Sequence, residues 1–308
     1  MTAELGAPTR ELPKLTHHQG SVIILLTGVG FSFGGLAFRS VEIGSWEYLF
    51  FRGVGMGAVA VVVLAVRYRG RLADLTSRLE SGHVYAGLVL GMMNLLFIVS
   101  LSFATVAFVL ILQAVAPLTA AYFSWLMLRE RPSSRVLIAT FVSIIGVAIM
   151  VGGSIVEDLS PFGLIAAAIP IGFGLYTTLV RSATRIDAMV PLVVAAVFLL
   201  LVGTVAVLLQ AGFDATWRDA AIGIFAGSVL LALPLSAFNV AQRVVPASES
   251  SLLIMTEIVL APLWVWIFVD ETASPTTLLG GLIILVAVVW VTVNRRPPRG
   301  RRMLTSRG

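Results

Sequence analysis

The chain has 308 residues, of which 58% are hydrophobic and 12% are charged, where an average soluble domain has about 25% charged residues. This composition excludes a soluble globular protein and predicts an integral membrane protein. The absence of cysteine excludes disulfides, cysteine-ligated metals and a thiol nucleophile. The net charge of +5 would suggest nucleic acid in a soluble chain, but here the basic residues lie between apolar segments, so no nucleic-acid partner is expected.

The two ends of the chain are polar. Residues 1–20 contain acidic residues and prolines, without a short apolar core followed by a cleavage site, so they predict a cytoplasmic tail and not a signal peptide. Residues 295–308 are rich in arginine and predict a second, basic cytoplasmic tail.

Ten apolar segments lie between the tails, each close to the roughly 20 residues that a membrane-spanning helix needs. The third and fourth come from one charge-poor stretch, 81–128, that is too long for a single helix, so a tight turn is expected at Ser102 and Phe103. The expected spans are 21–38, 48–66, 84–101, 104–128, 136–156, 162–180, 188–213, 220–242, 251–269 and 275–294.

The basic residues predict the orientation. With the N-terminus inside, 18 of the 21 Lys and Arg residues fall in inner tails and connections, leaving Arg39, Arg52 and Arg218 for the other side. Because Lys and Arg concentrate in cytoplasmic loops, we expect a multi-pass protein of the cell inner (plasma) membrane with both termini cytoplasmic.

Glu257 lies inside the ninth apolar segment, SLLIMTEIVLAPLWVWIFVD. An ionisable side chain at the centre of a membrane helix costs about 2.5–3.5 kcal/mol on insertion scales, and normally faces a bundle interior or a water-filled cavity. Glu257 is therefore predicted to mark a functional site. The structural alternative is that the helix starts earlier, near Ala247, and that Glu257 pairs with an arginine or reaches the surface.

The two halves of the chain repeat each other. GFSFGGLAFRS at 30–40 aligns with GFGLYTTLVRS at 172–182, and LMLRERPS at 126–133 aligns with IFVDETAS at 267–274. With five helices per half, the second copy enters the membrane from the opposite face. The predicted fold class is an all-α membrane protein whose ten transmembrane helices form two inverted five-helix repeats, at 21–156 and 162–294.

These features resemble the drug/metabolite transporter superfamily, in its EamA-like branch of ten-helix carriers, over about residues 20–294. The resemblance also includes Arg52 in FFRG, Pro117 thirteen residues before Glu130, and the two acids Glu257 and Glu271 of EIVLAPLWVWIFVDE. It implies a carrier with a central cavity lined largely by spans 1, 3, 4, 6, 8 and 9. Many such carriers export amino acids or related metabolites.

Polar side chains deep in the apolar segments are the candidates for lining this cavity. Each of them could instead only join helices, since interhelical hydrogen bonds are common and contribute about 0.6 kcal/mol on average. The candidates for substrate binding are Asn94, Gln113, Tyr176, Asn239 and Glu257.

Arg52, Pro117 and Pro262 are candidates for gating or for charge pairing. Arg52 lies a few residues inside the outer face, where Glu42 or Glu47 is its expected partner and substrate contact is the alternative. A proline inside a span removes a backbone hydrogen bond and bends the helix. Pro262 precedes the closing glutamate of its half by nine residues instead of thirteen, so the bend of the ninth span need not lie there.

The sequence thus predicts a secondary transporter that exports a small amino-acid-like or related metabolite by alternating access. An importer of the same superfamily and a passive channel are the alternatives, although a channel usually needs rings of like residues. The chain has three histidines and no HExxH motif, so no enzyme, bound metal or cofactor is expected. The expected partners are a small-molecule substrate, the lipid bilayer and, as one option, a proton, with the chain a monomer or homodimer.

Overall fold

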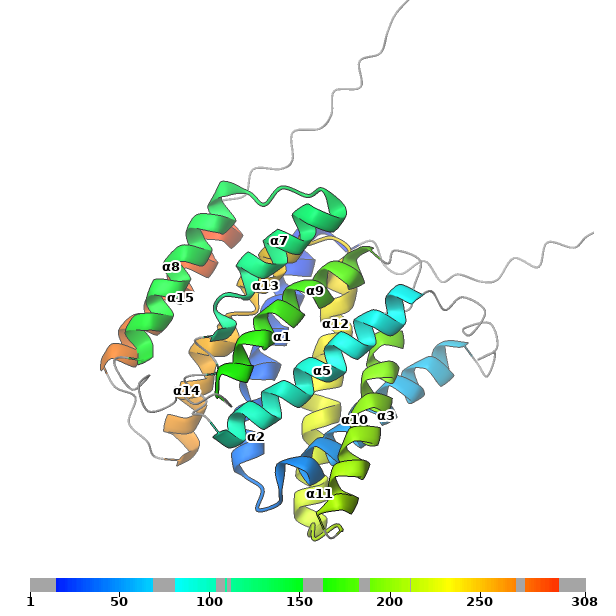
Figure 1. The fold of residues 1–308 in the computed structure, drawn as a ribbon. Coiled ribbons are helices and arrows are strands. Elements are labelled where there is room, and N and C mark those ends of the chain that lie inside the picture. Colours follow the sequence, from blue (N-terminus) through cyan, green and yellow to red (C-terminus); the bar gives the residue numbers. More distant parts are fainter. Residues whose placement is uncertain are drawn as a thin grey trace, which may run out of the picture.

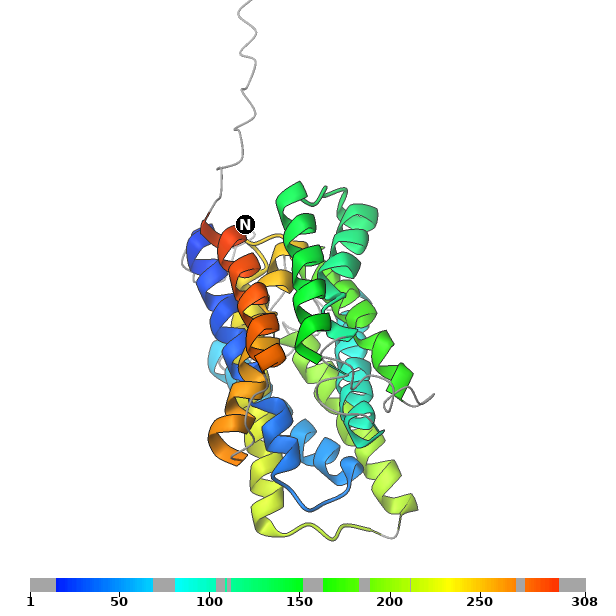
Figure 2. The same ribbon diagram turned by 90° about the vertical axis from the view of Figure 1, so that its left-hand side faces the viewer.

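A computed structural model describes residues 15–68, 81–103, 109, 112–151, 163–182, 189–210, 212–269 and 275–293. The described part forms a bundle of helices and contains no β-strand. The first helix begins and the last helix ends at the same end of the bundle (Figure 2), here called the terminal end. The opposite, distal end carries α2 and α11 (Figure 1).

The helices of the first half are α1 (His17–Ser32), α2 (Gly34–Arg39), α3 (Ser45–Tyr68), α5 (Ser81–Phe103), α7 (Ala116–Leu128) and α8 (Ser134–Val151). The second half has a 3₁₀ segment η2 (Gly163–Ala167), α9 (Ala168–Ser182), α10 (Val190–Leu209), α11 (Trp217–Phe225), a π-helical segment η3 (Ala226–Ala232), α12 (Leu233–Ala241), α13 (Ala247–Leu253), α14 (Thr256–Val269) and α15 (Pro275–Val293).

Six of these helical rods are long and apolar enough to cross a membrane, namely His17–Arg39, Ser45–Val66, Ser81–Phe103, Ile165–Ser182, Val190–Leu209 and Trp217–Ala241. Shorter apolar helices lie at Ala116–Leu128, Ser134–Ile149 and Leu279–Val291. The chain is therefore a multi-pass membrane protein, while the count of ten spans stays a prediction.

Several helix boundaries differ by a few residues from those expected, and two of these differences show their local cause. The first helix begins at His17, because Thr16 and Gln19 form a capping box in which each side chain accepts from the backbone N–H of the other. The turn expected at Ser102 and Phe103 is wrong: α5 continues through Phe103, and the hydroxyl of Ser102 donates to the carbonyl of Ile98 at 3.1 Å.

The outside of the bundle is apolar. Large hydrophobic side chains stay exposed on several helices, including Leu26, Val62, Phe141 and Leu201. Water-exposed surfaces of this extent are rare in soluble proteins, and lipid tails would cover them in a bilayer. The exterior therefore agrees with the composition, and the polar groups that matter for function must be sought inside.

The two halves contact each other through equivalent helices. The second helix of each half pairs with its counterpart, α3 with α10, and the fifth pairs likewise, α8 with α15 along one edge of the bundle (Figure 1). In the same way α1 packs on α12 and α14 as α9 packs on α5 and α7. This reciprocal pairing is the pattern that two related five-helix repeats produce.

Glycines let some of these helices touch without intervening side chains. A Cβ atom at Gly227 of η3 would overlap the backbone carbonyl of Arg52 on α3, and one at Gly55 of α3 would overlap the carbonyl of Ile224 on α11. Close approach of this kind is how small residues serve helix packing in membranes. The backbone of α3 is thereby fixed beside the segment that forms one wall of the cavity.

Candidate substrate cavity

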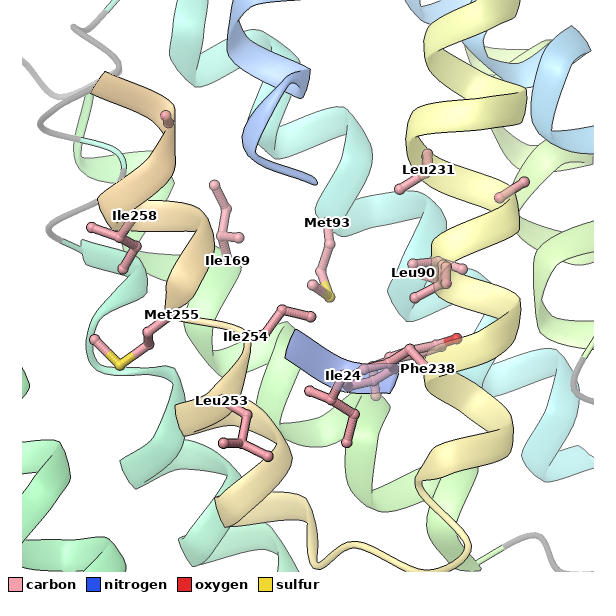
Figure 3. Close-up of a cluster of buried hydrophobic side chains, with 14 of the residues drawn as sticks. Ile24, Leu90, Met93, Ile169, Leu231, Phe238, Leu253, Ile254, Met255 and Ile258 are labelled. Atoms are coloured by element: carbon pink, nitrogen blue, oxygen red, sulfur yellow. The ribbon is translucent and has the colours of Figure 1, made fainter. Parts of the chain in front are cut away.

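A cavity lies in the middle of the bundle, between the helices of the two halves. Most of its wall is apolar: Figure 3 shows Met93, Leu231 and Ile254 reaching into the same space from α5, η3 and the α13–α14 connection. The cavity volume, counted for the centres of water-sized molecules, is about 100 Å³. One water needs roughly 10–15 Å³ by this measure, so there is room for several waters or a small solute.

The ninth span is interrupted at the cavity. Its first helix, α13, ends at Leu253 and α14 starts at Thr256, so Ile254 and Met255 lie outside the α-helices. The backbone N–H of Glu257 donates to Ile254 at 3.0 Å, an i to i−3 bond in place of the α-helical one. Glu257 therefore sits in the first turn of a new helix that starts inside the bundle.

The first half is interrupted at the matching place. Ala114 and Val115 form a turn immediately before α7, and Val115 N–H donates to Leu112 at 3.2 Å, again to the third residue back. The breaks lie 140 residues apart, close to the offset of the sequence repeats. Pairs of interrupted helices near the middle of the bundle are the usual construction of transporter substrate sites.

Glu257 and Arg52 both line the cavity. They are close enough to interact electrostatically, but they do not form an ion pair, and no side-chain hydrogen bond of Glu257 to a described residue is present. The partner expected for Arg52 was wrong: Glu47 accepts instead from the backbone N–H groups of Gly44 and Asp214. The reason is that Arg52 points inward and is only 6% exposed.

Asn94 and Gln113 also line the cavity, as predicted. The amide nitrogen of Asn94 donates to the carbonyl of Leu90 in its own helix at 2.9 Å, which leaves its oxygen for another donor. The amide nitrogen of Gln113 has no partner among the described residues. Gln113 directly precedes the break before α7, so its position depends on that interruption.

Tyr176 lines the cavity as well, whereas Asn239 lies behind it. The hydroxyl of Tyr176 donates to the side-chain oxygen of Asn239 at 2.8 Å, and both residues are almost fully buried. This bond joins α9 to α12 on the terminal side of the cavity. Asn239 is thus a support for Tyr176 in this structure and not part of the cavity wall.

Arg181 forms a second set of polar contacts, nearer to the terminal end than the bond between Tyr176 and Asn239. Its Nε lies 2.9–3.0 Å from both carboxylate oxygens of Glu130, and its Nη1 donates to the carbonyls of Gln242 and Val245 at 2.7 and 2.9 Å. Five residues separate Arg181 from Tyr176, about 7.5 Å along α9 at 1.5 Å per residue. We call Arg181, Glu130 and the carbonyls of Gln242 and Val245 the terminal latch.

The end of α7 explains how Glu130 reaches the latch. Arg129 has a left-handed backbone with φ of 57°, and the N–H groups of Arg129 and Glu130 both bond to the carbonyl of Ser124. This arrangement ends a helix sharply and is usually made with glycine. For a residue other than glycine, the left-handed conformation costs on the order of 1–2 kcal/mol. This conformation reverses the direction of the chain, so that Glu130 faces α9.

The two candidate prolines lie at different distances from the breaks in their spans. Pro117 is buried in the first turn of α7, directly after the break at Ala114 and Val115. Pro262 is within α14, whereas the interruption of that span lies seven residues earlier, at Met255. The expectation that the bend need not lie at Pro262 is therefore confirmed.

Sequence reasoning missed the latch and the π-helical segment. Arg181 stood out only as one basic residue among many, although it occupies the position of Arg39 in the aligned repeat. For η3 the available signal was Pro234, which follows it at the start of α12 and lacks the N–H that would continue regular bonding.

A helical bundle with an apolar exterior, two internal helix breaks and a central, mostly apolar cavity that holds a few polar side chains defines a membrane transport protein. The chain belongs to the EamA-like transporter family, whose model matches it twice, over residues 18–152 and 161–293. The double match shows that the chain consists of two repeats. No curated protein matches it.

The fold is shared with proteins of known structure. One solved structure, described as "Crystal structure of protein", is 14% identical in sequence and superimposes with a TM-score of 0.74, over 91% of this chain and 100% of its own. At this identity the likeness shows the fold alone.

Proposed function

We propose that the protein is a secondary transporter of the cell inner membrane that exports a small amino-acid-like metabolite by alternating access, with Glu257 as its essential carboxylate. The observation that carries this proposal is the position of Glu257. It lies in the first turn of an internally starting helix, faces a cavity and has no hydrogen-bonded side-chain partner among the described residues. A carboxylate kept there at a cost in insertion energy is available for an ammonium group or a proton.

Closure on one side supports alternating access. Two polar layers, the Tyr176–Asn239 hydrogen bond and the terminal latch, lie between the cavity and the terminal end. A passive channel would need a continuous path, whereas a carrier needs a barrier that forms and breaks on each side in turn. The two repeats, which we place at 21–156 and 162–294 with opposite orientations, would supply equivalent elements for the barrier on the other side.

The membrane sidedness is inferred from the charge distribution, and the direction of transport from the family resemblance. With 18 of 21 basic residues on the side of the termini, the terminal end is the cytoplasmic one. Export is proposed because the family resemblance includes many exporters. An importer of the same architecture is the nearest alternative, and a proton is a possible coupling ion for either.

Comparison of metabolites inside and outside overexpressing cells tests this function. Cells with the wild-type protein should accumulate a small amino-acid-like compound outside, and cells with Glu257→Gln at equal membrane abundance should not. Transport into everted vesicles distinguishes a carrier from a channel, because only a carrier can move the compound against its concentration gradient. Depletion of the compound from the medium would indicate an importer, and wild-type flux by the Gln variant at every pH would overturn the role of Glu257.

A further inference from the structure

The guanidinium of Arg52 is an unusual group to leave unpaired inside a membrane bundle. Its side chain is only 6% exposed, and its Nε and Nη1 atoms have no hydrogen-bond partner among the described residues. Tyr48 and Glu257 lie close enough to the guanidinium to interact with it, but buried N–H groups of a charged side chain that lack hydrogen bonds are unfavourable unless something else satisfies them. The cavity that Arg52 lines is where such a partner can bind.

The contacts of Arg52 hold the guanidinium ready for an anion. It lies over the ring of Phe97, 5.8 Å from the ring centre, a cation–π arrangement. Its backbone is fixed by the contact with Gly227. Stacking uses one face of the guanidinium plane, and the N–H groups of Nε and Nη1 remain available to donate to the oxygens of a carboxylate.

Gln113 supplies a second unused donor in the same cavity. Its amide nitrogen is buried and has no partner among the residues that the structure describes, and like Arg52 and Phe97 it is part of the cavity wall. Glu257 also borders the cavity, yet does not form an ion pair with Arg52. The cavity therefore offers a cation with spare donors, a neutral donor and a separate anion.

We propose that Arg52 and Gln113 form a subsite for a carboxylate, so that the transported molecule is a zwitterion whose ammonium group is left for Glu257. The inference rests on the proposed transport function and narrows its substrate class. A purely cationic amine would satisfy Glu257 and leave the donors of Arg52 unused. A zwitterion satisfies both charges and adds no net charge to the cavity.

The first test needs no knowledge of the substrate. The chain has no cysteine of its own, so Gln113→Cys introduces a single thiol. This thiol is treated with a methanethiosulfonate reagent that carries either a negatively charged sulfonate or a positively charged trimethylammonium group. The anionic reagent should react faster, and its advantage should fall at least several-fold when Arg52→Gln is added. Arg39→Gln, which changes an exposed arginine outside the cavity wall, should leave the ratio unchanged. An unchanged ratio with Arg52→Gln overturns the subsite.

The second test uses binding. Purified full-length protein is screened by thermal shift with neutral L-amino acids, and each stabilising acid is compared with its amide, which lacks the carboxylate charge. Arg52→Gln should weaken binding of the acid on the order of 10- to 100-fold and binding of the amide far less. The affinity of Arg52→Lys for the acid should lie between those of the wild type and Arg52→Gln, because lysine keeps the charge but lacks the planar guanidinium. Equal binding of acid and amide to the wild type overturns the subsite, and wild-type export of the natural compound would show that the transport function itself still stands.

Discussion

Arg181 and Glu130 come from different repeats, and their ion pair joins the end of α9 to the end of α7, with Nε 2.9 and 3.0 Å from the two carboxylate oxygens and Nη2 donating to Oε1 at 2.8 Å. The same arginine donates to the carbonyls of Gln242 and Val245 between α12 and α13. One side chain thus ties three helical segments together on the terminal side of the cavity. We therefore expect these bonds to break when this side of the cavity opens.

Weakening the latch should expose the cavity from the terminal side. We expect Arg181→Gln to raise the labelling rate of a cysteine at Ser251, a buried cavity residue, when an impermeant thiol reagent is applied to everted vesicles. Arg131→Gln changes an exposed arginine next to the latch and serves as the matched control. Equal rates in the wild-type and Arg181→Gln backgrounds would mean that other contacts close this side.

A charge exchange should not repair the latch fully. In Arg181→Glu combined with Glu130→Arg, the ion pair is restored but a carboxylate now faces the carbonyls of Gln242 and Val245, which accept and cannot donate. We therefore expect the double variant to label faster at Ser251→Cys than the wild type and more slowly than Arg181→Glu alone. Full recovery would show that only the ion pair matters.

Reporter fusions test the orientation. Fusions after Arg78 and Arg185 should report a cytoplasmic location, and fusions after Glu157 and Asp214 an external one, because the ten-span arrangement puts 18 of the 21 Lys and Arg residues on one side. A cytoplasmic signal after Glu157 would contradict the ten-span arrangement. These fusion points also decide on which side of the membrane the terminal latch lies.

Labelling of single cysteines tests which face of α5 is wet. Asn94 lines the cavity, and Leu96, roughly 200° further around the helix, packs with the hydrophobic core. An impermeant thiol reagent should therefore label Asn94→Cys from at least one side and Leu96→Cys slowly. The same comparison for Gln113 needs a new control, since Ile111 lies outside the described residues. Equal labelling at 94 and 96 would contradict the cavity assignment.

Gly227→Ala should destabilise the protein. The added methyl group would collide with the carbonyl of Arg52, a backbone atom that cannot move aside as a flexible side chain can, and such overpacking costs about 1–3 kcal/mol. Gly82→Ala in α5 meets nothing within 4 Å and is the control. The midpoint of thermal unfolding in detergent should fall clearly for the first variant only.

The sequence predicted the positions of the helices well because apolar length is a strong local signal. It also identified Glu257, Asn94, Gln113 and Tyr176, since a polar group inside an apolar run stands out without any knowledge of the fold, and all four line the cavity. Asn239 gives the same local signal, but it lies behind Tyr176, whose hydroxyl donates to it, and is not in the cavity wall. The sequence alone does not distinguish a polar residue that lines the cavity from one that only hydrogen-bonds to a lining residue.

Pairing across the bundle was the part that could not be predicted. The sequence favours a nearby glutamate as the partner of Arg52, whereas its neighbours in the structure are Tyr48 on the same helix and, from distant segments, Phe97 and Glu257. The latch joins residues 51 and more positions apart. The break at Ile254 and Met255 has no proline or glycine of its own, and it lies against Gly28 of α1, which is far away in the sequence.

The glycine contacts of α3 have a mechanical consequence. Gly227 and Gly223 place the backbone of η3 and α11 directly against Arg52 and Phe51, with no flexible side chain between them to absorb sliding. Any rearrangement that preserves these contacts moves α3 and η3 as one body, although they belong to different repeats. As long as these contacts persist, the unit that moves is not one half of the chain but an assembly that combines α3 of the first half with α11 and η3 of the second.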